Sequence, residues 1–277
     1  IHALNIENKI AILENSIALS ERGETYKDTV DIYGEEGKDL SRIEIQFFDE
    51  EDSMIEISTG QQKKYDKRTR SHLLMAFGFN NAIIEGQSIN KSPYKMGKSK
   101  FFEIGWTWST RLLEDSNNIR FRYGFAFQFN GLNPTDNKYF VQDGELAYLE
   151  EFPGSLTKSK LRMDNLVVPI HFEFGPSKKI DKGNYFRYST RKKFKFGIGT
   201  YFGFNLRTRQ KLKYTEDGSK RKDKVTQSYN TSNLIYGLSS YIGVDSFSIY
   251  VKYDLNRIFN EPNRKENNIS LGLRFDL

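Results

Sequence analysis

The stretch "IRFRYGFAFQF" (residues 119–129) alternates between two kinds of residue. Isoleucine, phenylalanine or tyrosine occupies every second position, and arginine, glycine, alanine or glutamine occupies the positions between them. Successive side chains of a β-strand point to opposite faces, so the alternation predicts a strand with one strongly apolar face. Its length also matches the roughly 9 to 11 residues with which a tilted strand crosses the apolar core of a bilayer.

The same alternation recurs through the C-terminal two thirds of the chain. It appears at residues 72–80, 101–110, 166–174, 194–205, 233–243, 246–255 and 267–277. Together with the first stretch, these segments predict an all-β fold, an antiparallel transmembrane β-barrel of about eight strands. A soluble β-sandwich or a lipocalin-like barrel has similar alternation and remains the alternative from the pattern alone.

The face opposite the apolar one favours the membrane barrel. It combines glycine with charged residues, which suits the curvature and the narrow lumen of a small barrel. Charges that point into such a lumen are tolerated only when they pair with one another. We therefore expect a lumen charge network built from Glu103, Arg120, Arg122, His171, Glu173, Lys195 and Arg274.

The composition agrees with a membrane barrel and excludes other classes. Of 277 residues, 22 are Phe, 16 are Tyr and 2 are Trp, an aromatic content that suits the girdles at membrane interfaces. Mean hydropathy is −0.65, and no apolar run of about 18 residues occurs, so no transmembrane helix is predicted. The absence of Cys excludes a disulfide framework and a zinc–thiolate site.

The connections between the predicted strands vary in length in a regular way. Outer-membrane barrels alternate short periplasmic turns with longer external loops. Here three long connections, at 80–100, 131–161 and 206–231, contrast with short turns at 114–118 and 244–246. The segment 175–193 is longer than a periplasmic turn should be, and it is either a periplasmic contact or simply a longer turn.

Residues 71–277 resemble the outer-membrane β-barrel proteins of Bacteroidota, the PorT-like or porin-like family. The resemblance rests on the aromatic alternation, on "LVVPIHFEF" (166–174) and on the terminal "ISLGLRFDL" (269–277). It implies an outer-membrane location and a last strand that the barrel assembly machinery recognises through Leu271, Leu273, Phe275 and Leu277. Many such signals end in Phe, whereas this chain ends in Leu.

Residues 1–70 differ from the rest, and we expect them to form a periplasmic arm. An apolar seam at spacings of three and four predicts an amphipathic helix, with Ile6, Ile10, Leu13 and Ile17 on the seam. The pattern starts in mid-helix, so further helix is expected before Ile1.

A short hairpin is expected after this helix. It sets Ile43, Ile45 and Phe47 opposite Met54 or Ile55 and Ile57. The seam then either packs on this hairpin or serves as a docking or oligomerising coil.

Residues suited to catalysis are few. Among 3 His, His171 stands two positions before Glu173 on the polar face of one predicted strand. A satisfied interior histidine is the ordinary explanation, and a barrel hydrolase acting on lipid A or peptides is the alternative. An eight-stranded barrel is filled by its own side chains, which disfavours a small-solute channel. We expect no enzyme activity, no cofactor and no metal site.

The predicted function is that of a non-enzymatic outer-membrane anchor or accessory subunit that binds partner proteins. The resemblance implies a secretion complex or the barrel assembly machinery as its setting. The basic stretch at 211–224 contributes to a net charge of +6, and it either aids solubility or contacts lipopolysaccharide phosphates. Nucleic acid is not expected as a partner, because no aromatic interleaving or reading element accompanies the charge.

Overall fold

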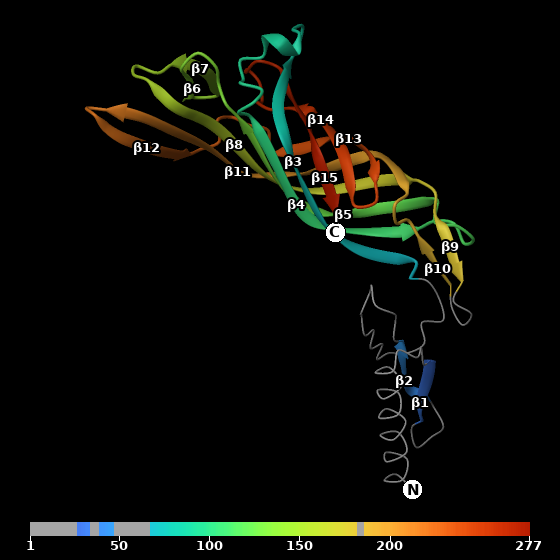
Figure 1. Ribbon diagram of the computed structural model, residues 1–277. Helices are drawn as coiled ribbons and strands as arrows, with labels where there is room; N and C mark the ends of the chain where they lie inside the picture. The colour runs from blue at the N-terminus through green and yellow to red at the C-terminus, as the bar shows by residue number, and fades with distance from the viewer. Residues whose placement is uncertain (1–26, 34–38, 47–66, 182–185) are drawn as a thin grey trace. The chain divides into compact units, whose positions relative to one another are not determined.

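A computed structural model describes residues 27–33, 39–46, 67–181 and 186–277. Nearly all regular structure in these ranges is β-strand (Figure 1). No helix within them is long and apolar enough to cross a membrane. The chain divides into a small unit of residues 1–66 and 181–186 and a large unit of residues 67–180 and 187–277.

The large unit is a closed antiparallel barrel. Eight strands hydrogen-bond in a ring, each to its neighbours in chain order. They are β3 (Thr69–Ile84), β4 (Lys100–Arg111), β5 (Ile119–Leu132), β8 (Leu156–Phe174), β11 (Phe194–Glu216), β13 (Leu234–Val244), β14 (Phe247–Arg257) and β15 (Glu266–Asp276). The ring closes because β15 pairs with β3, where Leu271 lies opposite Phe79 and Arg274 lies opposite Ala76. The predicted antiparallel barrel of about eight strands is confirmed.

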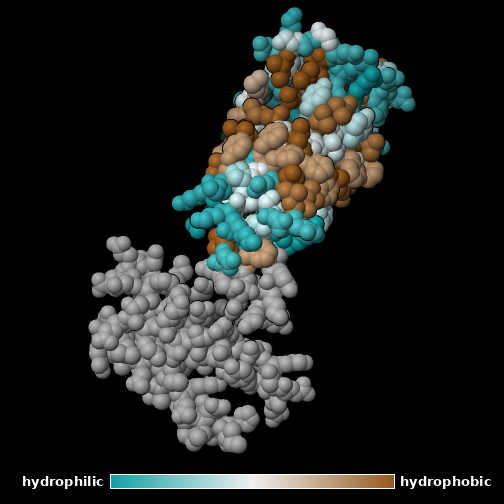
Figure 2. Space-filling view, turned by 90° about the vertical axis from the view of Figure 1, so that its right-hand side faces the viewer, coloured by the Kyte–Doolittle hydropathy of each residue, from teal (hydrophilic) through white to brown (hydrophobic). Residues whose placement is uncertain are grey.

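The two faces of the barrel strands differ as the alternation predicts. On β5, Phe125 is 44% exposed on the outer face, whereas the next residue, Ala126, is fully buried. Figure 2 shows the outward apolar residues as a band with hydrophilic residues at both ends of it. The inward face therefore builds the core of the barrel, and the described residues leave the outward face exposed.

Several strands run beyond the barrel at one end (Figure 1). β8 and β11 stay paired from Phe174 opposite Phe196 as far as Leu156 opposite Tyr214, with a bulge after Asn205. β12 (Ser219–Thr226) pairs with the far part of β11. We call residues 156–164, 207–216 and 219–226 the strand extension.

The prediction of loops at 131–161 and 206–231 is therefore wrong in large part, because strands occupy much of both segments. β8 and β11 have 19 and 23 residues, longer than a single crossing requires. A hairpin of β6 (Lys138–Asp143) and β7 (Leu146–Glu151) lies within the first predicted loop. The alternation continues in the extension, but basic residues replace the apolar ones, so an apolar pattern does not reveal these strands.

An apolar cluster closes the barrel at the end of the strand extension. Aromatic side chains from separate connections meet there: Phe140 lies 6.2 Å from Tyr94, 5.6 Å from Phe259 and 6.3 Å from Tyr229, measured between ring centroids. The Tyr94 hydroxyl also donates a 2.7 Å hydrogen bond to Glu266, and burial raises the pKa of Tyr94 well above its usual value. The cluster also includes inward residues of the barrel strands, among them Leu132 and Leu161, so it packs into the lumen at this end.

The opposite end of the barrel carries mostly short connections. The turn at 112–118 and the two-residue turn at 245–246 both lie there, as antiparallel pairing of the flanking strands requires. The longer segment 175–193 contains β9 (Lys178–Asp181) and β10 (Phe186–Ser189), which pair with each other. Its role as a periplasmic contact stays a prediction.

In the small unit, β1 (Lys27–Tyr33) and β2 (Asp39–Gln46) form an antiparallel pair, with Val30 opposite Ile43. β2 contains the predicted "RIEIQ" strand, and it pairs with β1, a strand that the alternation did not predict. The segment "TVDIY" (29–33) within β1 is rich in β-branched and aromatic residues, which favour a strand. The predicted helix and its seam, and the second strand expected at 54–57, lie outside the described residues.

Candidate functional site

The outer face of the barrel is an apolar belt. Large side chains are about half exposed on every strand of the ring, for example Phe202 at 49%, Ile249 at 50% and Leu271 at 52%. Water-soluble monomers rarely expose so large a continuous apolar surface. The belt therefore faces lipid, and the soluble sandwich considered from the sequence does not fit.

The lumen near the short turns holds a buried charge network centred on two carboxylates. Glu173 on β8 accepts hydrogen bonds from Arg120 Nε at 2.6 Å, Arg122 Nη1 at 3.0 Å and the Tyr241 hydroxyl at 2.8 Å. All four side chains are less than one tenth exposed. Arg122 is shared, because its Nη2 also reaches a carboxylate on another strand.

That second carboxylate is Asp276 on β15. It accepts from Arg122 Nη2 at 2.7 Å, Lys195 Nζ at 2.8 Å and Arg274 Nη2 at 2.9 Å. The Arg274 guanidinium also lies over the Tyr241 ring, 4.3 Å from its centroid. Buried cations are stable only when paired in this way, and these pairs link β5, β11 and β15 across the lumen.

A second charged cluster lies farther along the lumen. Lys252 Nζ donates to Glu103 Oε2 at 2.8 Å, and both side chains are fully buried. Tyr201 donates to Asp254 nearby. The structure therefore separates Glu103 from the arginine cluster in which the sequence analysis included it.

Among the cluster members absent from the predicted network are Asp276, Lys252 and Tyr241. Asp276 and Lys252 stand at inward positions of predicted strands, so the alternation could have placed both in the lumen. The sequence did not predict a hydrogen bond from Tyr241, because an aromatic residue at an inward position usually indicates apolar packing. Its ring passes over Gly197, where an added Cβ would lie 2.1 Å from Tyr241 Cζ.

His171 does not join Glu173. Its Nε2 lies 2.7 Å from the Ser239 hydroxyl oxygen, and both residues are less than 5% exposed. Glu173 is instead committed to Arg120, Arg122 and Tyr241, so no acid orients the imidazole. A buried Ser–His pair that a substrate cannot reach fits a structural hydrogen bond better than a hydrolase site. Within the described residues, no group of His, Asp and Glu is arranged to hold a metal ion.

The predicted assembly signal lies on the outward face of β15. Leu271, Leu273 and Phe275 project from this strand into the apolar belt, and the Phe275 ring stacks 5.8 Å from Phe77 on β3. Leu277 exchanges two backbone hydrogen bonds with Leu73, at 2.8 and 2.9 Å. These residues help to close the ring, while their recognition during assembly stays a prediction.

A closed antiparallel ring with a lipid-facing belt and a polar, filled lumen defines the class of the protein. It is a transmembrane β-barrel of the kind found in bacterial outer membranes. At eight strands, the side chains of the two charged clusters and of the apolar cluster occupy the lumen.

Comparisons with known proteins are limited to fold. Neither a protein-family model nor a curated protein matches the chain. Among solved structures, the attachment invasion locus protein Ail of Yersinia pestis is similar at 12% identity over 75% of this chain and 97% of that chain, with a TM-score of 0.32.

Two further structures align over 76% of this chain and 100% of their own. Neisserial surface protein A does so at 11% identity with a TM-score of 0.32, and a mutant porin of Rhodopseudomonas blastica at 8% identity with a TM-score of 0.18. At these values no property of those proteins transfers to this chain.

Proposed function

We propose that this protein is a non-conducting, non-enzymatic outer-membrane anchor that serves as an accessory subunit of a protein complex. One observation carries the proposal: the lumen is filled by paired charges, with Arg122 joining Glu173 to Asp276 across it. A barrel with this interior is stable in the membrane but offers no route for solutes and no accessible catalytic group. Its function therefore lies outside the bilayer.

The proposed orientation follows from the lengths of the connections. Outer-membrane barrels place short turns in the periplasm and long loops outside. The strand extension is then external, and β3 starts from the periplasmic end, so residues 1–70 belong to the periplasm. A Bacteroidota-type secretion or barrel assembly complex is the setting that the sequence resemblance supports.

Partner binding is assigned to the arm. The seam residues Ile6, Ile10, Leu13 and Ile17 would leave an apolar stripe uncovered on a helix, and a partner protein that supplies a complementary apolar surface would cover it. The external side is assigned a different ligand, the phosphates of lipopolysaccharide, because basic residues dominate positions 211–224.

Planar-bilayer recording of the purified full-length protein tests the first part of the proposal. We expect no stable single-channel steps, since the lumen is blocked at both charged clusters. Reproducible steps of nanosiemens size would contradict a non-conducting anchor.

Affinity purification in mild detergent tests the second part. The double variant Ile10→Asp and Leu13→Asp should keep barrel folding and lose co-purifying proteins. The matched control is Asn8→Asp with Asn15→Asp, which adds the same charge to the opposite face of the predicted helix. Retention of every partner by the seam variant, or a wild-type protein that purifies alone, would contradict a docking arm.

A further inference from the structure

The outward face of the strand extension carries lysine in cross-strand rows. Directly paired residues of antiparallel strands place their side chains on one face. In one row Lys160 lies opposite Lys211, which lies opposite Lys224; in the next, Lys213 lies between Lys158 and Lys222. We call these residues the lysine face: Lys158, Lys160, Lys211, Lys213, Lys222 and Lys224.

The acidic residues of the β11–β12 hairpin lie on its other face. There the Tyr214 hydroxyl donates to Asp223 at 2.8 Å, and Arg221 pairs with Glu216 at 3.4 Å. Within the described residues, no ion pair involves a member of the lysine face. A surface charged for solubility alone mixes both signs, whereas this hairpin separates them.

Like charges directly opposite one another weaken a sheet. The ammonium groups of the lysine face repel one another in this way, and they lie beyond the apolar belt. Burial and the neighbouring lysines of the face lower the pKa of Lys211. Burial, followed by Lys158, Arg162 and Lys211, lowers the pKa of Lys160. A bound polyanion would remove this repulsion and supply the missing partners.

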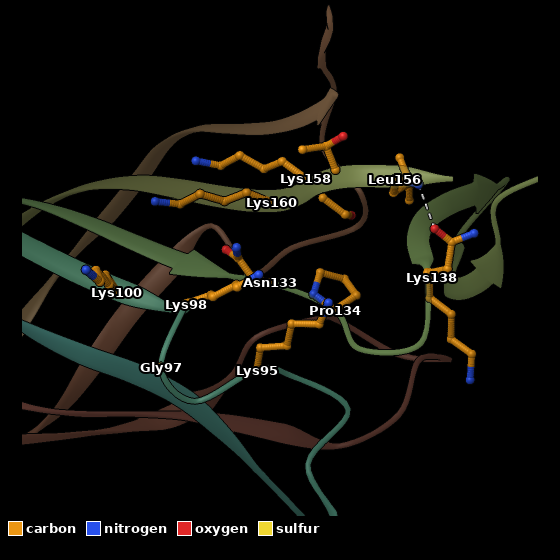
Figure 3. A pocket seen from close by; sticks show the side chains of 13 residues that line it. Lys95, Gly97, Lys98, Lys100, Asn133, Pro134, Lys138, Leu156, Lys158 and Lys160 are labelled. Carbon is orange, nitrogen blue, oxygen red and sulfur yellow. Dashed lines mark hydrogen bonds between the residues drawn. The ribbon is translucent and has the colours of Figure 1, made fainter. Parts of the chain in front are cut away.

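The lysine face continues into a cleft of about 530 Å³. Lys158 and Lys160 line it from β8, and in Figure 3 their side chains run in the same direction from the strand, whereas Lys138 points away. Other lysines line it from the connection between β3 and β4 and the start of β4, namely Lys95, Lys98 and Lys100. The lining of this cleft contains no Asp or Glu.

The cleft also presents neutral polar groups. Asn133 and Ser159 line it, and their side-chain oxygens are buried without a hydrogen-bond partner among the described residues. Buried polar atoms normally have a partner, so a ligand hydroxyl that reaches these oxygens on binding would supply the missing one. Gly131 keeps space for Lys160, because an added Cβ there would lie 2.3 Å from Lys160 Cε.

The height of the lysine face above the belt indicates what it meets. The last exposed apolar residues of β11 are Phe204 and Leu206, at 61% and 57%. Lys211 follows five positions later, which at about 3.3 Å per residue is roughly 16 Å along the strand. With a tilt near 45° this is about 12 Å above the belt, the level of a large lipid headgroup rather than of acyl chains.

We propose that the lysine face and the adjoining cleft bind the phosphorylated saccharide headgroup of an outer-leaflet lipid. Ammonium groups hold the phosphates, and the amide and hydroxyl groups of the cleft bind sugar hydroxyls. The inference deepens the proposed function, since it depends on the strand extension being external. It assigns the contact to a face and cleft built from β8, β11, β12 and the start of β4, rather than to a basic loop.

Binding of lipopolysaccharide by the full-length protein in detergent tests the proposal, with affinity measured at two salt concentrations. The triple variant Lys158→Gln, Lys160→Gln and Lys211→Gln should lose at least tenfold in affinity. Lys91→Gln, Lys178→Gln and Lys192→Gln remove the same charge from exposed sites elsewhere and should change it less than twofold. Equal affinities of the two triple variants would overturn the assignment.

Three competitor arms identify the ligand. Enzymatically dephosphorylated lipopolysaccharide should bind at least tenfold more weakly than the intact lipid. Phosphatidylglycerol micelles should compete poorly, since they lack the sugar. Inositol hexakisphosphate should compete poorly, since it has no free sugar hydroxyls for the cleft. Competition by either as strong as that of lipopolysaccharide would replace the proposed ligand by a general anionic surface or a free polyanion.

The same samples separate this proposal from the proposed function. Each variant is checked for the gel shift between unheated and boiled protein and for silence in planar bilayers. If the lysine variant folds, shows no conductance and no longer binds lipopolysaccharide, the result supports the lysine face as the binding site. A conducting or unfolded wild-type barrel would instead contradict the anchor.

Discussion

Arg122 on β5 and Asp276 on β15 form a 2.7 Å ion pair inside the barrel although 154 residues separate them in the chain. Asp276 is the last residue of the last strand and the acceptor for three buried cations. The strand that closes the ring on the outside therefore also completes the charge balance on the inside. Closure of the ring and charge balance in this part of the lumen therefore depend on the same strand.

The substitution Asp276→Asn should be strongly destabilising. It leaves Arg122, Lys195 and Arg274 buried without their shared carboxylate, and breaking a buried ion pair in this way costs about 3–5 kcal/mol. Urea unfolding in detergent, followed by tryptophan fluorescence, measures the loss. The control is Asp245→Asn at an exposed turn, which should change the free energy of unfolding by less than about 0.5 kcal/mol. Similar values for both variants would show that the lumen network does not stabilise the barrel.

The pair of Glu103 and Lys252 should show strong coupling. Because both side chains are fully buried, Glu103→Gln or Lys252→Met alone should each cost several kcal/mol, on the order of 3–5. The double variant removes both charges and should recover most of that loss. A double-mutant cycle on the free energy of unfolding measures the coupling. Additive losses would mean that the two side chains do not depend on each other.

The substitution Leu271→Lys tests the lipid-facing belt. Leu271 lies midway along β15 and is 52% exposed, so its ammonium group would enter the bilayer near the midplane, at about 2–4 kcal/mol. Unfolding from lipid vesicles reports this cost. Val225→Lys on β12 is the matched control, since Val225 is also an exposed apolar residue but belongs to the strand extension. An equal effect at both positions would argue against a membrane boundary between them.

The substitution Gly197→Ala should disturb the lumen through Tyr241. The added methyl would meet the Tyr241 ring at 2.1 Å and displace the hydroxyl from Glu173, and overpacking of this kind costs about 1–3 kcal/mol. The free energy of unfolding and near-ultraviolet circular dichroism of the tyrosines report the change. Gly97→Ala is the control, because nothing lies within 4 Å of its added Cβ. An unperturbed tyrosine signal in Gly197→Ala would contradict the close contact of ring and backbone.

Local pattern was enough for the barrel itself. Alternation at every second position depends only on the pleat of a strand, so the outward set on β15 and the inward set on β5 could be read residue by residue. The same pattern failed in the strand extension, where lysine takes the outward positions and hydropathy no longer marks the strand. In the small unit it did not reveal β1, the strand that pairs with β2.

Which inward charges meet was decided by tertiary structure alone. Alternation shows that Glu103 points inward, but not that Lys252 on β14 lies across from it, because that depends on the curvature of the closed ring and on the register of every pair between them. The lysine face arises in the same way. The lysines of β8 and of the β11–β12 hairpin, about 50 residues apart in the chain, become one surface only when these strands align in register. Alternation determines the facing of each strand, and long-range pairing determines its neighbours.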